Sequence, residues 1–75
     1  MRESLKRFSN YQEKILKEND YKGGWTNDSD GILLLRAVEE LTELKKAIIN
    51  CEPQSIKKEC GDVANFMMMI FDNQK

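Results

Sequence analysis

The sequence predicts a small all-α protein of three helices, with helices two and three forming an antiparallel hairpin. Three observations lead to this prediction. Apolar residues recur every three or four positions in three separate stretches. Turn-forming residues gather between the first two stretches. The link between the last two is short, which makes them antiparallel neighbours. With 75 residues, the chain is expected to be a single domain spanning 1–75.

The first helix is expected over residues 3–19, followed by a long loop. Its apolar side carries Leu5, Phe8, Ile15 and Leu16. The stretch NDYKGGWTNDSDG, residues 19–31, then breaks the pattern, because it holds three of the four glycines among Asn, Asp and Ser residues. Loops of this length in compact domains are often functional.

The second helix is expected from about Asp30 to about Asn50, with Asp28, Ser29 or Asp30 as its N-cap. Its apolar stripe consists of Leu34, Ala37, Leu41, Leu44 and Ile48. The third helix is expected from Pro53, a residue suited to a first helical turn, to about Asp72. Its apolar stripe consists of Ile56, Cys60, Val63, Met67 and Ile70.

Composition excludes several classes of function. The net charge of −1 lacks the basic footprint of a nucleic-acid-binding protein. There is no histidine, and two cysteines, Cys51 and Cys60, are too few for a closed zinc site within one chain. We expect both to be reduced thiols in a cytoplasmic protein. The chain opens without a signal peptide and contains no stretch long enough to cross a membrane, so no membrane association is expected.

The chain is also expected to self-associate. A chain this short buries a modest fraction of its surface and has a marginal core by itself. The run Met67, Met68 and Met69 covers too many directions for one small core. We therefore predict a homo-oligomer, at least a dimer, in which the hairpins assemble into a four-helix-bundle-like arrangement.

Two acidic pairs are placed level with each other by the predicted hairpin. Glu40 and Glu43 are three residues apart, as are Glu59 and Asp62, so each pair shares one helix face. With Cys51 as the centre of the turn, Glu43 and Glu59 are equally distant from it, and so are Glu40 and Asp62. Since packed helix axes lie about 8–10 Å apart, inward-leaning side chains from both helices can meet.

Four carboxylates in one cleft would repel each other, and a hard divalent cation removes that conflict. Ligation by oxygen atoms alone suits Mg²⁺, with Mn²⁺ as the alternative. The plainer interpretation is that these are ordinary surface acids. Their partners would then be the neighbouring lysines Lys45, Lys46, Lys57 and Lys58.

The motif EELTE at 39–43, fifteen intervening residues and ECGD at 59–62 resemble the EExxE…ExxD signature of the MazG-like nucleoside triphosphate pyrophosphohydrolases. That family belongs to the all-α NTP pyrophosphatases, with dimeric dUTPases and dCTP pyrophosphatases. The resemblance covers helices two and three, about half of the chain. KGGW before helix two and DVANFMMMIFDN after the second acidic pair also look like short versions of the family.

The resemblance implies Mg²⁺-dependent cleavage of the α–β phosphoanhydride of a nucleoside triphosphate, giving a monophosphate and pyrophosphate. By the motif match, Glu40, Glu43, Glu59 and Asp62 would be metal ligands. Glu39 occupies the first motif position and would orient or deprotonate the attacking water. The chain is shorter than many relatives, which build four-helix bundles, often across a dimer.

Three further residues are candidates for substrate binding. Arg36 lies one turn before Glu40 and is a phosphate contact or a surface ion pair. Lys22, in the glycine-containing loop, is a second phosphate candidate. Trp25, the only tryptophan, either stacks on a base or anchors the loop to the helices. Phe66, Met69 and Asn73 follow the second acidic pair along helix three and either line the pocket or pack in an interface.

Two other functions compete with the enzymatic one. The first is a non-enzymatic dimeric helical module with solvated acids and a Met-rich face that binds a partner helix. The second is a degenerate family member that binds nucleotides without turnover, although all five motif carboxylates are present. The base and sugar of a nucleotide substrate are not specified by the sequence.

Overall fold

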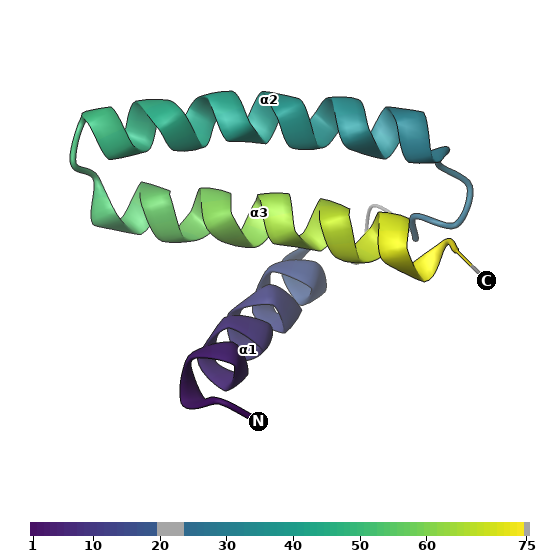
Figure 1. The fold of residues 1–75 in the computed structure, drawn as a ribbon, viewed down its shortest axis with the longest axis horizontal. Coiled ribbons are helices and arrows are strands. Elements are labelled where there is room, and N and C mark those ends of the chain that lie inside the picture. Colours follow the sequence, from purple (N-terminus) through teal and green to yellow (C-terminus); the bar gives the residue numbers. More distant parts are fainter. Residues whose placement is uncertain (20–23, 75) are drawn as a thin grey trace.

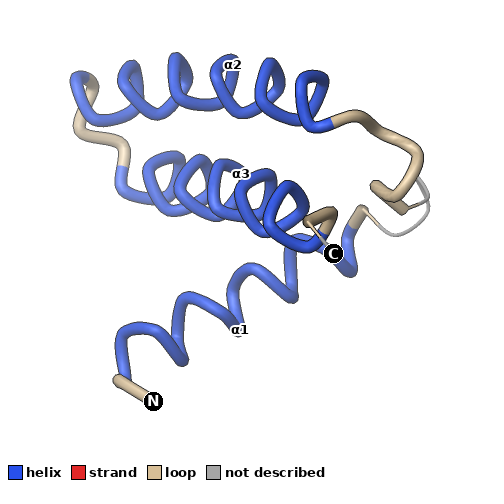
Figure 2. Tube along the Cα trace, turned by 45° about the vertical axis from the view of Figure 1, so that its right-hand side comes forward, coloured by secondary structure: helices blue, strands red, loops and turns tan. Residues whose placement is uncertain are grey.

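The computed structural model describes residues 1–19 and 24–74. It contains the helices α1 (Glu3–Glu18), α2 (Asp30–Ile49) and α3 (Pro53–Asp72) (Figure 1). No strand occurs in these residues, so the predicted all-α class is confirmed. Helices α2 and α3 run antiparallel, and α1 packs across α3 rather than on α2 (Figure 2). Within the described chain, none of the helices has the length and apolar character needed to cross a membrane.

The helix boundaries follow from local chemistry. Ser29 caps α2, because its hydroxyl oxygen accepts a hydrogen bond from the backbone N–H of Ile32 at 3.2 Å. Pro53 opens α3, where its missing N–H costs nothing. Between them, Cys51 has a φ of 54°, a left-handed conformation that reverses the chain direction over few residues. This tight turn sets the register of the hairpin.

The line of α2 that faces α3 differs from the predicted stripe. Leu33, Ala37 and Ala47 are buried. Leu34, Leu41 and Ile48, which were predicted to share the stripe with Ala37, are instead 52%, 49% and 55% exposed. The buried line of α2 is thus rotated toward Leu33, and the larger residues Leu34, Leu41 and Ile48 lie on the surface. Glu40 is half-buried and lines the cavity described below.

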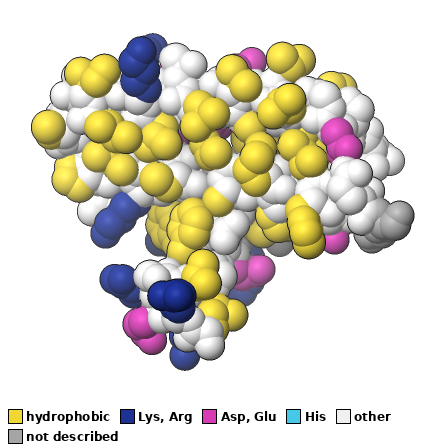
Figure 3. Space-filling model, viewed as in Figure 1, with side chains coloured by type: hydrophobic (Ala, Val, Ile, Leu, Met, Phe, Trp, Pro, Cys, Tyr) yellow, Lys and Arg dark blue, Asp and Glu magenta, His cyan; other side chains and the backbone are white. Residues whose placement is uncertain are grey.

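The displaced residues form an exposed apolar surface along the hairpin, which we name the hairpin apolar face. Its exposed members are Leu34, Val38, Leu41 and Ile48 of α2 and Met67 and Phe71 of α3. Figure 3 shows hydrophobic side chains gathered over both helices in this view. Such a surface is unusually apolar for a small monomer.

Candidate functional site

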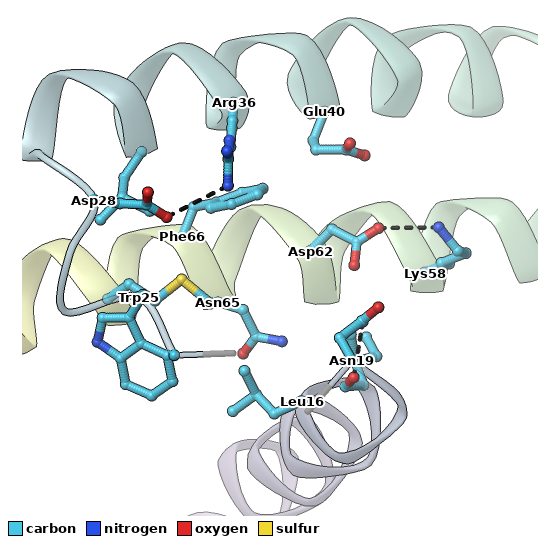
Figure 4. Close-up of a pocket in the computed structure, with 14 residues that line it drawn as sticks. Leu16, Asn19, Trp25, Asp28, Arg36, Glu40, Lys58, Asp62, Asn65 and Phe66 are labelled. Carbon is cyan, nitrogen blue, oxygen red and sulfur yellow. Dashed lines mark hydrogen bonds and ion pairs between the residues drawn. The ribbon is translucent and has the colours of Figure 1, made fainter. Parts of the chain in front are cut away.

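The hairpin brings together three of the acidic side chains identified in the sequence. Glu40 of α2 and Glu59 and Asp62 of α3 each present one carboxylate oxygen, and these three atoms lie within 4.8 Å of one another. All three residues are partly buried. Glu40 and Asp62 approach each other from opposite helices (Figure 4). We refer to Glu40, Glu59 and Asp62 as the acidic triad.

Glu59 is the most constrained member of the triad. Its side chain is only 13% exposed, and its Oε2 atom is buried without a hydrogen-bond partner in the described structure. Burial raises the pKa of Glu59 from 4.5 to about 7, and a hydrogen bond with Glu40 and the negative charge of Glu40 add to this rise. The Glu59 carboxyl therefore retains its proton up to near-neutral pH. A buried acid beside a second acid is disfavoured in its charged form, and a cation bound between them would favour that form.

Lys58 supplies the positive charge nearest to the triad. Its Nζ donates a hydrogen bond to Asp62 Oδ2 at 3.1 Å and lies 3.8 Å from Glu59 Oε1. The hydrogen bond with Asp62, followed by the charge of that carboxylate, raises the pKa of Lys58 above its ordinary value of 10.5. Lys58 is thus a permanent cation at the edge of the acidic cluster.

A cavity of about 360 Å³ opens beside the triad, bounded by all three helices and the segment before α2. Glu40, Asp62 and Lys58 lie toward one end of it (Figure 4). Toward the other end, Arg36 forms an ion pair with Asp28 at 3.5 Å between Nη1 and Oδ2. The volume is within the range of small-molecule binding sites. The cavity therefore joins a cluster of acids to a region with an arginine.

Two aromatic rings line the same cavity. Trp25 is half-buried, and its indole Nε1 is buried without a hydrogen-bond partner in the described structure. Phe66 of α3 lies nearer the middle of the cavity (Figure 4). Trp25 thus lines one side of the cavity, and its contact with a base stays a prediction. Both rings offer flat apolar surface to a ligand.

Helix α1 is held against α3 close to the triad. Asn65 is 3% exposed, and its amide exchanges two hydrogen bonds with Gln12, to the side chain at 3.1 Å and to the backbone carbonyl at 3.3 Å. A Cβ atom at Gly61 would collide with Cδ1 of Ile15 and lie 3.1 Å from Cε2 of Tyr11. Gly61 immediately precedes Asp62 in the sequence, so α1 packs against α3 right beside the triad, where the missing side chain of Gly61 leaves room for it.

The remaining predicted residues lie outside the triad. Glu43 is exposed and forms an ion pair with Lys46 at 3.6 Å, so the fourth predicted ligand does not join the other three in this conformation. Glu39 is exposed and does not line the cavity. Lys22 falls outside the described residues. Phe66 and Met69 line the cavity, as one of their two interpretations expected.

Sequence reasoning missed three contributors to the site. Lys58 was considered only as a surface partner for the acids, although its spacing of four residues from Asp62 is typical of a helical ion pair. Asn65 had no assigned role, yet it is the buried polar residue that links α1 to α3. Asp28 was considered only as a helix cap, whereas its carboxylate holds Arg36 beside the cavity. The sequence did contain a signal for this role, because Asn65 is a polar residue within an otherwise apolar stretch of α3.

The acidic triad fits a hard divalent cation. Its donors are carboxylate oxygen atoms from two helices, and Glu59 Oε2 is buried without a hydrogen-bond partner among the described residues. Three protein carboxylates leave coordination positions for water and phosphate, as is usual for Mg²⁺.

Comparisons with protein-family models, curated proteins and solved structures find no match to this chain.

Proposed function

We propose that this chain is a Mg²⁺-dependent nucleoside triphosphate pyrophosphohydrolase that converts an NTP or dNTP into the monophosphate and pyrophosphate. The observation that carries the proposal is the meeting of Glu40, Glu59 and Asp62 beside a cavity that also holds Arg36 and an aromatic wall. An acidic cluster alone would repel a triphosphate. Once the cluster holds a divalent cation, the cation and the arginine can bind the phosphates of a nucleotide, and the two aromatic rings can contact its base.

The triad would hold Mg²⁺, or Mn²⁺ in its place, with Glu43 as a fourth ligand after a change of rotamer that releases Lys46. When bound, the cation would neutralise the acids, attract the phosphates and make water a stronger acid. Arg36 would leave or share Asp28 to contact a phosphate, since its guanidinium already faces the cavity. The end of the cavity with the triad would thus receive the metal-bound phosphates. The end with Arg36 and Trp25 would receive a further phosphate and the base.

The reaction is a displacement at the α-phosphorus. Water forms a new P–O bond, the bond to the bridging oxygen breaks, and the electron pair leaves with pyrophosphate. The water proton would pass to Glu39, which does not line the cavity in this structure and would first have to turn its exposed side chain from solvent toward a water held beside Glu40. Trp25 would stack on the base, where an aromatic contact is worth about 1–3 kcal/mol for any base.

The proposed oligomer is a dimer of identical chains joined through the hairpin apolar face. The chain exposes 5860 Å², whereas a compact protein of 8.8 kDa is expected to expose about 4,800 Å². The excess, about 1,100 Å², is close to the roughly 800 Å² that each partner buries in a standard interface. Arg36 points about 160° away from Leu34 around α2, so a partner on this face leaves the cavity open.

The exposed apolar face also favours the competing function, a non-enzymatic helical module that binds a partner helix. The two functions differ in their dependence on the acids. An adaptor needs the apolar face and tolerates neutral residues in the triad, whereas a hydrolase loses activity when either Glu40 or Asp62 is neutralised.

The test combines Mg²⁺ titration calorimetry with a pyrophosphate-release screen over the common and modified NTPs and dNTPs. Wild-type protein is expected to bind Mg²⁺ and release pyrophosphate from at least one nucleotide. Glu40→Gln and Asp62→Asn should lose both properties, while Glu13→Gln, an exposed acid of α1, should retain them. Absence of metal binding and of release would contradict the proposal and favour the adaptor. Metal binding without release of pyrophosphate from any nucleotide would favour the degenerate family member.

A further inference from the structure

The ammonium group of Lys58 lies beside the carboxylates of the acidic triad. Its ammonium group contacts two of the three acids, at 3.1 Å from Asp62 and 3.8 Å from Glu59. It is also close enough to the third, Glu40, for that charge to contribute to the raised pKa of Lys58. One side chain therefore lies against two members of the triad and donates a hydrogen bond to one of them.

We propose that Lys58 is a displaceable counter-ion, whose ammonium group stabilises the triad in the absence of metal and is expelled when a divalent cation binds. This inference rests on the proposed metal site. A metal bond to either oxygen of Asp62 would withdraw electron density from the carboxylate and so weaken the hydrogen bond that Oδ2 accepts from the Lys58 ammonium at 3.1 Å. Two positive charges within one small cluster also repel each other.

The geometry around Lys58 permits this exchange. Its side chain is 64% exposed, whereas those of Glu59 and Asp62 are 13% and 18% exposed. The lysine stem is therefore free to move while the acids stay fixed on α3. A second, smaller cleft of about 220 Å³ adjoins Lys58 and Asp62 and is lined by Tyr11, Lys14 and Glu18 of α1. The cleft gives the ammonium a place to turn without passing through the buried side of the triad.

A displaced counter-ion makes two opposite contributions, one to each state of the protein. In the metal-free protein it reduces repulsion between the acids and so stabilises the fold. In the binding reaction it is a competitor, because its contacts must be broken before the metal can be held. Removal of Lys58 should therefore weaken the metal-free fold and tighten metal binding, and the two changes should be equal in free energy.

The experiment compares wild-type protein with Lys58→Met, Lys58→Arg and the matched control Lys57→Met, which changes an exposed neighbouring lysine. Mn²⁺ affinity is measured by electron paramagnetic resonance, and thermal stability is measured with and without saturating Mg²⁺. We expect Lys58→Met to bind Mn²⁺ about twofold to fivefold more tightly, the change in affinity that corresponds to one exposed ion pair. Its melting temperature should fall without metal and return to that of wild type with Mg²⁺.

Lys58→Arg and Lys57→Met should both retain wild-type affinity. The ammonium resonance of Lys58, followed by NMR, should lose the signature of its contact with Asp62 when Mg²⁺ saturates the site. An ammonium contact that persists at saturating Mg²⁺, or equal Mn²⁺ affinity in Lys58→Met and wild type, would overturn the inference and leave the metal site standing. If neither wild type nor Lys58→Met binds metal, the proposed function and this inference both fail.

Discussion

Glu59→Gln is expected to stabilise the metal-free protein while destroying its proposed function. The pKa of Glu59 is about 7 in the folded chain and 4.5 ordinarily, so folding retains a proton that the unfolded chain releases between these values. The stabilising contribution of the protonated carboxyl is complete below about pH 4.5 and is lost as pH rises through 7. At about 1.36 kcal/mol per pKa unit the upper bound is about 3 kcal/mol. Because Glu59 and Glu40 titrate as an interacting pair, we expect about 1–2 kcal/mol.

The assay is urea unfolding in EDTA from pH 4.5 to pH 8.5, with Glu13→Gln as the control for loss of an exposed acid. Glutamine imitates the protonated carboxyl, so the variant and wild type should coincide near pH 4.5 and diverge toward pH 8. With Mg²⁺ at pH 8, wild type should gain stability and the variant should gain none. Equal stability of the two proteins at pH 8 without metal would refute the electrostatic reasoning.

Three further predictions follow from the packing and charges of the site. Gly61→Ala should lower the free energy of unfolding by up to about 2 kcal/mol, because the collision of its methyl group with Ile15 of α1 costs about 1–3 kcal/mol and the gain in helix propensity offsets only about 1 kcal/mol. Gly31→Ala, where a methyl group meets only an atom at 3.9 Å, should be neutral or raise it by up to about 1 kcal/mol, as thermal unfolding would show. Calorimetric Mg²⁺ affinity should fall about tenfold per pH unit below about pH 6, since a proton competes for Glu59; a flat profile would exclude this ligand. Leu41→Glu should weaken self-association at least about 100-fold in sedimentation experiments. Ile32→Glu, which lies off the hairpin apolar face, should not; equal effects would contradict the assigned interface.

Much of the fold is a direct consequence of features visible in the sequence. The Ser29 cap, Pro53 at the start of α3 and the three- and four-residue apolar spacing define the helices. The short turn at Cys51 sets the register, and register is what brings Glu40 level with Asp62 and near Glu59. These are local or nearly local effects, so they need no knowledge of the packed core.

The parts that escaped prediction depend on contacts between helices. Leu33 and Leu34 are neighbours on a helix that is apolar over a wide arc, so spacing alone did not specify which would be buried. The buried set Leu33, Ala37 and Ala47 depends on how α2 is rotated against α3, which is fixed only in the packed hairpin. The seat of α1 depended on Gly61, whose missing Cβ matters only once Ile15 lies against it.

At the site, too, the sequence predicted the residue types and their spacing but not the contacts that form after folding. Spacing identified the acids but could not tell which of them would turn inward, and Glu43 pairs with Lys46 on the surface instead. The rotamer of Lys58 likewise follows from the local charge balance of a folded cluster. Ion pairs at helical spacing have many alternatives of similar energy, and only the folded arrangement selects among them.

The most direct test of the central claim is a crystal structure of the protein grown with Mn²⁺, with anomalous scattering used to locate the ion. We expect an anomalous peak about 2.0–2.2 Å from one carboxylate oxygen of each of Glu40, Glu59 and Asp62. A map in which Mn²⁺ lies elsewhere, with Lys58 still bound to Asp62 at saturating metal, would contradict it.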